Sequence, residues 1–322
     1  MQPITVAQYG IGPIGIQIVK LLLTKPWVRI VAAVDVDPNK VGRDLGEVIG
    51  IDRNLGIEVT PRLSTAADVV CHSTGSWLAE VSGQLVELLS GGSNVVSTCE
   101  ELAFPLNADV LGPLQRAASS ANVSLLGTGV NPGFVMDKLP LTLTAVCQEV
   151  RSVEVFRKVD AAKRREPLQR KVGAGMSQDQ FATAVQGGRI KHMGLRESLM
   201  MIAKGLGTGF ESVSEEEIMP VIAERDIATQ YLSVRSGDVA GVHQTIHGKG
   251  RIDVSLDIRM YVGADEPSDR VIIRGVPDVE MIIPGGVHGD LATAAMAVNC
   301  IPRLIAAPAG VLTMDDISVT YK

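Results

Sequence analysis

The chain has 322 residues, of which 46% are hydrophobic but only 3% aromatic, so its core must be built from aliphatic side chains. This apolar fraction is too high for a disordered chain, and the length suggests about two domains. A formal charge of −6 without a dominant basic block argues against a nucleic-acid partner.

The N-terminal sequence MQPITVAQYG has no basic segment followed by an apolar one, so no signal peptide is expected. No run of about 18 uninterrupted apolar residues occurs, so no membrane partner is expected. The four cysteines form no CxxC pair, and we expect neither a metal site nor a disulfide framework. These features predict a cytoplasmic localisation.

Short apolar runs alternate with helical patterns in the first part of the chain. A helical pattern follows the first run, and another covers 77–92. The runs, expected to be strands, are 4–9, 28–37, 68–73, 94–98 and 123–129. Strands that alternate with helices predict βαβ units and a mostly parallel sheet.

The pattern changes after about residue 150. The segment 177–180, SQDQ, is typical of a capping box that opens a helix, and a further helix is expected over 195–206. Apolar and polar residues then alternate over 251–262, which predicts a long strand with one solvated face. A turn is expected before it at 248–250, and two more strands are expected at 271–275 and 279–286.

Together these patterns predict an α/β protein with three parts. Residues 1–135 would form a Rossmann dinucleotide-binding domain. Residues 136–288 would form an α+β substrate domain with an open, largely antiparallel sheet. The apolar, helical segment 289–322 would pack back on the first domain.

A glycine-rich loop follows the first expected strand and opens a helix. Gly10 permits a tight turn, Gly12 lets backbone N–H groups approach a pyrophosphate, and Gly15 allows close helix packing. Asp35 lies at the end of the second strand, 20 residues beyond Gly15, where an acid accepts hydrogen bonds from ribose. The alternative is a tight strand–helix turn without a ligand.

Asp35 would repel a 2′-phosphate, so NAD is the expected cofactor. Lys40 and Arg43 follow closely and would soften that preference, which leaves NADP possible. Ligands of open α/β sheets bind beyond the carboxyl ends of strands, so later strand ends join the candidate set. The candidate cofactor-binding residues are Gly10, Ile11, Gly12, Pro13, Ile14, Gly15, Asp35, Ser73, Thr74 and Thr98.

Two adjacent carboxylates, Glu100 and Glu101, directly follow the strand 94–98. Neighbouring side chains of an extended segment point in opposite directions, so one of them would face the cleft and the other water. Glu101 is the first catalytic candidate and Glu100 the second. Cys99 offers an alternative as a thiol nucleophile, but two carboxylates beside it would raise its pKa and favour an inert thiol.

The expected junction between the domains supplies the substrate candidates. Phe134, Val135 and Met136 follow Asn131 and are apolar, so they would either enclose the alkyl part of a substrate or pack the hinge. His192 follows an expected helix, and it either lines the cleft or is an ordinary packing residue.

Several segments resemble a known family: YGIGPIGIQIVKLLL, VDVDPNKVGRDLGEVIG, NVVSTCEELAFP, LGTGVNPGFVMD, HMGLRESLMMIAKGLG and ATAAMAVNCIPRLIAAPAG. They are similar to the dihydrodipicolinate-reductase-like group, and within it to the 2,4-diaminopentanoate dehydrogenases and native NAD(P)H-dependent amine dehydrogenases. The resemblance implies reversible reductive amination of a small ketone or aldehyde with ammonia. It also implies a catalytic glutamate within 97–101 and a homodimer formed by the sheet of the second domain.

Three functions therefore remain open besides a silent dinucleotide sensor. They are amine dehydrogenation of a small ketone or aldehyde, the same reaction on 2,4-diaminopentanoate, and acylating aldehyde oxidation through Cys99. The segment 161–171, AAKRREPLQRK, departs from the pattern of the diaminopentanoate enzymes, which puts the diamino acid in doubt.

Overall fold

The computed structural model describes residues 2–214 and 216–322. The chain divides into two compact units, each with its own sheet. The first unit contains the residues up to Phe134 together with His288–Lys322, and the second contains Val135–Val287.

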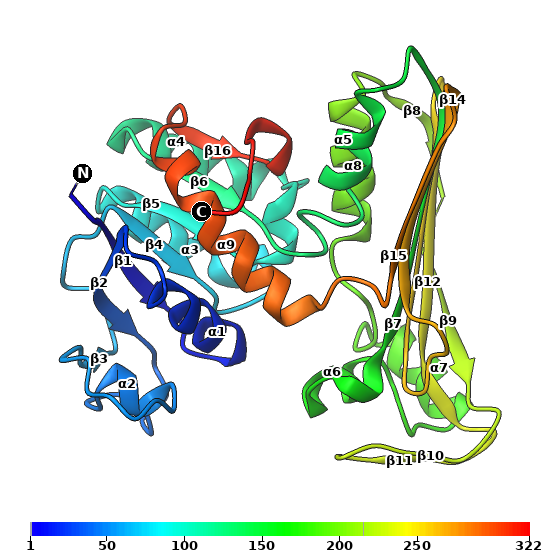
Figure 1. Ribbon diagram of the computed structural model, residues 1–322, viewed down its shortest axis with the longest axis horizontal. Coiled ribbons are helices and arrows are strands. Elements are labelled where there is room, and N and C mark those ends of the chain that lie inside the picture. The colour runs from blue at the N-terminus through cyan, green and yellow to red at the C-terminus, as the bar shows by residue number, and fades with distance from the viewer. Residues whose placement is uncertain (1, 215) are drawn as a thin grey trace. The chain divides into compact units, whose positions relative to one another are not determined.

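The first unit is built on a parallel sheet with the order β16-β6-β5-β4-β1-β2-β3 (Figure 1). Strands β1 and β4 are neighbours at its centre, where the order reverses, and the carboxyl ends of such strands are the usual place for a ligand. The strands are β1 (Ile4–Tyr9), β2 (Val28–Val34), β3 (Val59–Thr60), β4 (Val69–His72), β5 (Asn94–Ser97), β6 (Ser124–Gly127) and β16 (Gly310–Leu312).

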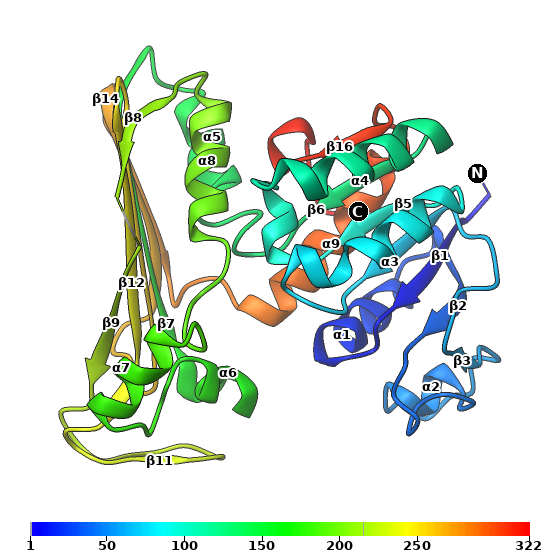
Figure 2. The same ribbon diagram turned by 180° about the vertical axis from the view of Figure 1, so that it is seen from behind.

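Helices cover both faces of this sheet, as Figures 1 and 2 show from opposite sides. Helix α1 packs beside α9 on one face, and α3 packs beside α4 on the other. The core between them is aliphatic, as the low aromatic content predicts. The helices are α1 (Pro13–Leu22), α2 (Leu45–Val48), α3 (Leu78–Ser90), α4 (Ala108–Ala121) and α9 (Gly289–Ile305), with short 3-10 helices η1 (Glu100–Ala103) and η3 (Met314–Asp316).

The second unit is built on a mixed, largely antiparallel sheet with the order β15-β14-β7-β13-β12-β8, and β9 also pairs with β12. The one parallel pair described in it is β7 with β13. The strands are β7 (Glu149–Asp160), β8 (Phe210–Val213), β9 (Glu217–Ile222), β12 (Val239–Gly250), β13 (Asp253–Tyr261), β14 (Ser268–Val276) and β15 (Val279–Pro284).

Helices of the second unit lie on one face of this sheet (Figures 1 and 2). Ser177 and Gln180 form the expected capping box at the start of α7, and α8 occupies the range expected for a helix. The remaining elements are α5 (Lys138–Thr144), η2 (Ala161–Lys163), α6 (Glu166–Lys171), α7 (Gln178–Gln186), α8 (Leu195–Gly205) and the small hairpin β10 (Ile227–Ala228) and β11 (Ser233–Val234).

The prediction of a turn at 248–250 was wrong, because these residues belong to β12. Gly248 pairs with Val254 and Val213 inside the sheet, and the chain turns two residues later, at 251–252. Gly248 makes room for the ring of Phe210, because a Cβ at this position would lie 2.7 Å from that ring. Strand β13 accordingly begins at Asp253 and not at residue 251.

Strand β7 lies between β13 and β14 and is one of the elements that were not predicted from the sequence; α4, β8, β9 and β12 are others. The buried positions of β7 alternate with half-buried ones, because Val153, Val155 and Arg157 face inward. Among the described residues, no helix combines the length and the apolar character needed to cross a bilayer.

Candidate functional site

The glycine loop between β1 and α1 is shaped by close backbone contacts. Gly10 has a φ of +89°, in the left-handed region that favours glycine. A Cβ at Gly15 would lie 2.0 Å from the carbonyl oxygen of Gly10, so only glycine allows the helix to approach the turn. A Cβ at Gly12 would meet no protein atom within 4 Å, so the space beside this residue is open.

Helix α1 begins without a capping side chain. Gly12 is its N-cap residue, and Pro13 follows at the first helical position. The N–H groups of a first helical turn lack partners within the helix and favour an anion. The cradle at Gly10 and Gly15 and the open space beside Gly12 therefore fit a dinucleotide pyrophosphate.

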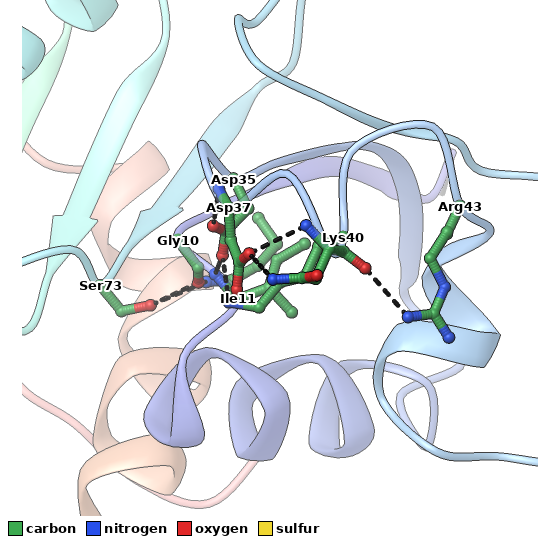
Figure 3. Close-up of polar contacts among 9 residues, drawn as sticks. Gly10, Ile11, Asp35, Asp37, Lys40, Arg43 and Ser73 are labelled. Carbon is green, nitrogen blue, oxygen red and sulfur yellow. Dashed lines mark hydrogen bonds and ion pairs between the residues drawn. The ribbon is translucent and has the colours of Figure 1, made fainter.

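Gln8 and Ser73 hold this loop in place through hydrogen bonds to the carbonyl oxygen of Gly10. Gln8 donates from Nε2 to the carbonyl oxygen of Gly10 at 2.8 Å and to Ser73 Oγ at 3.0 Å, and Ser73 Oγ donates to the same Gly10 carbonyl at 2.9 Å. Ser73 thus lies against the loop, as Figure 3 shows. Sequence reasoning missed Gln8, although a lone amide in the apolar run 4–9 was a usable signal.

The carboxylate of Asp35 is also hydrogen-bonded to the glycine loop (Figure 3). Its Oδ2 accepts from the N–H of Ile11 at 2.8 Å and from Lys40 Nζ at 2.9 Å, and its Oδ1 accepts from the N–H of Asp37 at 2.9 Å. Burial raises the pKa of Asp35, but the hydrogen bonds from Asp37, Lys40 and Ile11 outweigh it and hold the pKa below the ordinary value. The carboxylate is therefore ionised at neutral pH.

A buried polar network follows β4. His72 Nδ1 lies 2.9 Å from Ser97 Oγ, and its Nε2 lies 2.9 Å from both Gln84 Oε1 and Thr74 Oγ1. Thr74 also donates to Gln84 Oε1 at 2.8 Å, so the hydroxyl of this cofactor candidate is engaged within the network. Burial lowers the pKa of His72 to about 4, so its imidazole is neutral at pH 7.

The two glutamates lie in η1, directly after β5. Glu101 Oε2 accepts from the N–H of Leu78, the first residue of α3, at 2.6 Å. Its own N–H donates to the carbonyl oxygen of Ser76 at 3.4 Å. In the described part of the chain, Glu101 Oε1 makes no hydrogen bond and neither does the carboxylate of Glu100. Glu101 is therefore the positioned member of the pair.

Cys99 is completely buried beside these glutamates. Its thiol donates to the carbonyl oxygen of Ser76 at 3.2 Å. Burial raises the pKa of Cys99 to about 12, and the charges of Glu100 and Glu101 act in the same direction. A buried thiol that stays protonated is a poor nucleophile, which argues against acylating aldehyde oxidation. Thr98, between Ser97 and Cys99, donates its N–H to the carbonyl oxygen of His72 at 3.0 Å.

The loop 73–78 joins these features. Ser73 contacts Gly10, while Ser76 and Leu78 contact the η1 segment. The glycine loop and Glu101 consequently lie at the same carboxyl edge of the parallel sheet. Gly10 to Gly15, Asp35, Ser73, Thr74, Thr98 and both glutamates are thus brought together within one unit.

The substrate candidates divide between the units. Asn131 and Phe134 belong to the first, and Val135 and Met136 begin the second. Val135 and Met136 are fully buried, a placement that favours packing over contact with a substrate.

His192 lies in the second unit and is held through its backbone. Its N–H donates to Gln244 Oε1 at 2.9 Å, and Gln244 Nε2 donates back to the His192 carbonyl at 3.1 Å. Burial, with the charges of Lys171 and Arg157 adding to it, lowers the pKa of His192 to about 3. Its ring is therefore uncharged at pH 7. Gln244, a buried amide in β12, was also missed from the sequence.

Comparison with known proteins gives consistent matches. Residues 134–321 match the family model of the 2,4-diaminopentanoate dehydrogenase C-terminal domain. The chain is 31% identical to 2,4-diaminopentanoate dehydrogenase of Acetoanaerobium sticklandii, over 99% of this chain and 94% of that protein. It is 24% identical to an amine dehydrogenase of Streptomyces virginiae, over 94% of this chain and 91% of that protein.

A solved structure shares the whole fold. The amine dehydrogenase from Mycobacterium smegmatis superimposes with a TM-score of 0.88 at 24% identity, covering 99% of this chain and 97% of that one.

Proposed function

The chain belongs to the 2,4-diaminopentanoate dehydrogenase family and is an oxidoreductase that acts on amines, and we propose that it catalyses the reversible reductive amination of a small ketone or aldehyde with ammonia. When bound, a nicotinamide cofactor supplies the hydride for amination and removes it in the reverse direction. The glycine loop 10–15 and Asp35 would hold this cofactor, with Ser73, Thr74 and Thr98 beside them.

The position of Glu101 is the observation that carries this proposal. Reductive amination forms a carbinolamine from ammonia and the carbonyl compound, expels water, and passes through an iminium ion. A carboxylate stabilises the positive charge on that nitrogen, and it also moves the protons that the carbinolamine loses and gains. Leu78 holds one oxygen of Glu101 in place at 2.6 Å, while the other oxygen remains available.

A second substrate, 2,4-diaminopentanoate, stays in consideration because the relative at 31% identity is named for it. The reaction would be the same, so the two possibilities differ only in the group that surrounds the reacting carbon. The segment 161–171 differs from the pattern of the diaminopentanoate enzymes, and this difference favours a small ketone or aldehyde as the substrate.

The deciding experiment is an assay of NADH oxidation with ammonium and a panel of small ketones and aldehydes. The reverse assay follows NAD reduction with 2,4-diaminopentanoate. Turnover only in the second assay would move the assignment to the diamino acid. Cofactor binding without turnover in either assay would reduce the chain to a dinucleotide sensor and contradict the proposal.

Asp35→Ala should raise the KM for NADH by about tenfold and that for NADPH by less than about threefold, because the carboxylate serves the ribose hydroxyls and repels a 2′-phosphate. Initial rates with each cofactor at saturating substrate measure this. Asp35→Asn is the matched control, because its side-chain oxygen can still accept from the Ile11 N–H. Equal increases for both cofactors would refute the ribose assignment.

We further propose that the sheet of the second unit forms a homodimer. The face of this sheet that no helix covers carries the charged residues Asp257 and Arg259 on β13. It also carries an apolar residue, because the half-buried Phe156 of β7 pairs with Asp257. Met219 and Ile282, on outer strands of the same face, have exposed fractions of 39% and 53%. Apolar groups within a polar face are typical of an interface between protein chains.

Light scattering at micromolar concentration should give twice the mass of one chain. Ile282→Asp should shift the mass toward that of a monomer, because a carboxylate at this apolar position opposes burial. A wild-type protein that scatters as a monomer would refute the dimer.

A further inference from the structure

A groove lies in the first unit between α3 and the connection from β3 to β4. Its volume is about 570 Å³, within the range of pockets that hold small ligands. Residues 61–66, the second half of α3 and Tyr9 at the end of β1 contribute to its lining. The glycine loop, Asp35, Ser73 and Thr74 do not line it, so this α3 groove is separate from the candidate cofactor site.

Two opposite charges line the α3 groove without pairing. Arg62 follows β3, and Glu87 lies on α3. Within the described residues, neither side chain makes an ion pair or a hydrogen bond. Both charges act on Tyr9: burial raises the pKa of its phenol, Glu87 adds to the rise, and Arg62 opposes it. The groove therefore presents a guanidinium and a carboxylate to whatever enters it.

Tyr9 adds a hydrogen-bonding group between these charges and the sheet. Its ring is half-buried and stacks on the ring of His72, with the centroids 5.7 Å apart. Its hydroxyl makes no hydrogen bond within the described residues, and the raised pKa keeps it protonated at neutral pH. The phenol is thus held in place by its ring while its O–H remains able to donate.

Apolar surface completes the α3 groove. Leu63 is half-buried and Leu88 is buried, and both belong to the lining. A complementary ligand therefore has one positive group, one negative group and a short apolar part. A simple anion or cation would match one charge of the groove and leave the other unmatched.

We propose that the α3 groove binds a small zwitterion of the α-amino acid class. The carboxylate of the ligand lies at Arg62, its ammonium group at Glu87, and its apolar side chain against Leu63 and Leu88. This site goes beyond the proposed function, because its occupation requires neither the cofactor nor turnover.

The test is isothermal titration calorimetry of the full chain with L-leucine at neutral pH, in the absence of cofactor, ketone and ammonium. Two analogues serve as matched ligands: isocaproate keeps the carboxylate of leucine, and isoamylamine keeps its ammonium group. The wild-type protein should bind leucine, and it should bind each analogue at least about tenfold more weakly, because each lacks one charge-assisted hydrogen bond.

Three variants locate the site. Arg62→Gln and Glu87→Gln should each weaken leucine binding by at least about fivefold, because each removes one of the two charges. Tyr9→Phe keeps the ring and should weaken it by about threefold. Arg62 and Glu87 are exposed, so their replacement should not prevent folding.

Arg116→Gln and Glu80→Gln are the matched controls. Each removes a charge of the same sign from an exposed helical position of the same unit, outside the lining of the groove. Both should change the affinity for leucine by less than about twofold. Fluorescence titration with NADH should give affinities within about threefold of the wild-type value for Arg62→Gln and Glu87→Gln.

Four results would overturn the proposal. They are no leucine binding by the wild-type protein, equal binding of leucine and either analogue, an unchanged leucine affinity in Arg62→Gln and Glu87→Gln, or a loss of NADH affinity in these two variants. The last result would assign the α3 groove to the dinucleotide. Selective leucine binding together with an absence of turnover would leave this inference standing and remove the proposed reaction, so the two failures are distinguishable.

Discussion

Glu101→Gln should lower kcat/KM for reductive amination by at least about 100-fold while leaving the affinity for NADH unchanged. The glutamine keeps the shape of the side chain, and its oxygen can still accept from the N–H of Leu78. What it removes is the negative charge that stabilises the iminium nitrogen and the base that moves its protons. The loss should appear mainly in kcat, because the charge is needed after ammonia and the carbonyl compound have combined.

The matched control is Glu100→Gln. Its carboxylate makes no hydrogen bond within the described residues, so we expect it to retain most of the activity. Initial rates with saturating NADH give kcat/KM, and fluorescence titration gives the affinity for NADH. If Glu101→Gln keeps more than about a tenth of kcat/KM, a loss below about 1.4 kcal/mol, the glutamate or the mechanism has been assigned wrongly. A large loss in Glu100→Gln alone would transfer the role to Glu100.

The nucleotide-binding half of the fold was predictable because its signals are local. The run 4–9, the spacing of Gly10, Gly12 and Gly15, and the acid Asp35 lie within one βαβ unit. Each of these residues is recognised by its spacing within this unit, and the short apolar runs place the strand ends within a few residues. The carboxyl edge, and with it the location of Glu101, follows from the parallel topology.

The contacts that position the site were not predictable, because they join distant segments. Gln8 braces Ser73 across 65 residues, and Gln244 holds His192 across 52. Composition and periodicity report which face a residue occupies, but not which polar partner it meets there. Gly248 illustrates the same limit: glycine signals a turn in a sequence, whereas here it makes room for a ring from another strand.

Asp35 makes contacts that its position in the sequence does not predict. The spacing predicts an acceptor for ribose, and the structure adds a hydrogen bond from Ile11 and an ion pair with Lys40. Lys40 thereby balances the negative charge of Asp35, whereas the sequence shows only that the two residues are five positions apart.

The buried imidazole of His72 should make the protein sensitive to mild acid. Its pKa is about 4 in the folded chain against 6.5 as the ordinary value. Above pH 6.5 both folded and unfolded states hold the ring neutral, so it contributes no pH dependence there. Between pH 6.5 and 4 the unfolded state binds the proton more readily, so the free energy of unfolding falls as the pH falls.

At about 1.36 kcal/mol per pH unit, this difference amounts to about 2 kcal/mol at pH 5 and about 3 kcal/mol below pH 4. Protonation is costly because the positive charge would be buried away from water, beside Gln84 and Tyr9. His192, with its pKa lowered to about 3, acts in the same direction, so the acid sensitivity of the chain combines both rings.

Urea unfolding at pH 7.5 and pH 5.0 measures the effect. His72→Gln should lose about 2 kcal/mol less than the wild-type protein between these two pH values, whatever its stability at pH 7.5. His247→Gln, an exposed histidine of β12, is the matched control and should follow the wild-type protein. The titration of the His72 ring is also followed directly by NMR in the wild-type protein, which tests the prediction even if His72→Gln does not fold. A His72 ring that titrates near pH 6.5 in the folded chain would show that the network with Ser97 and Gln84 does not exclude the proton.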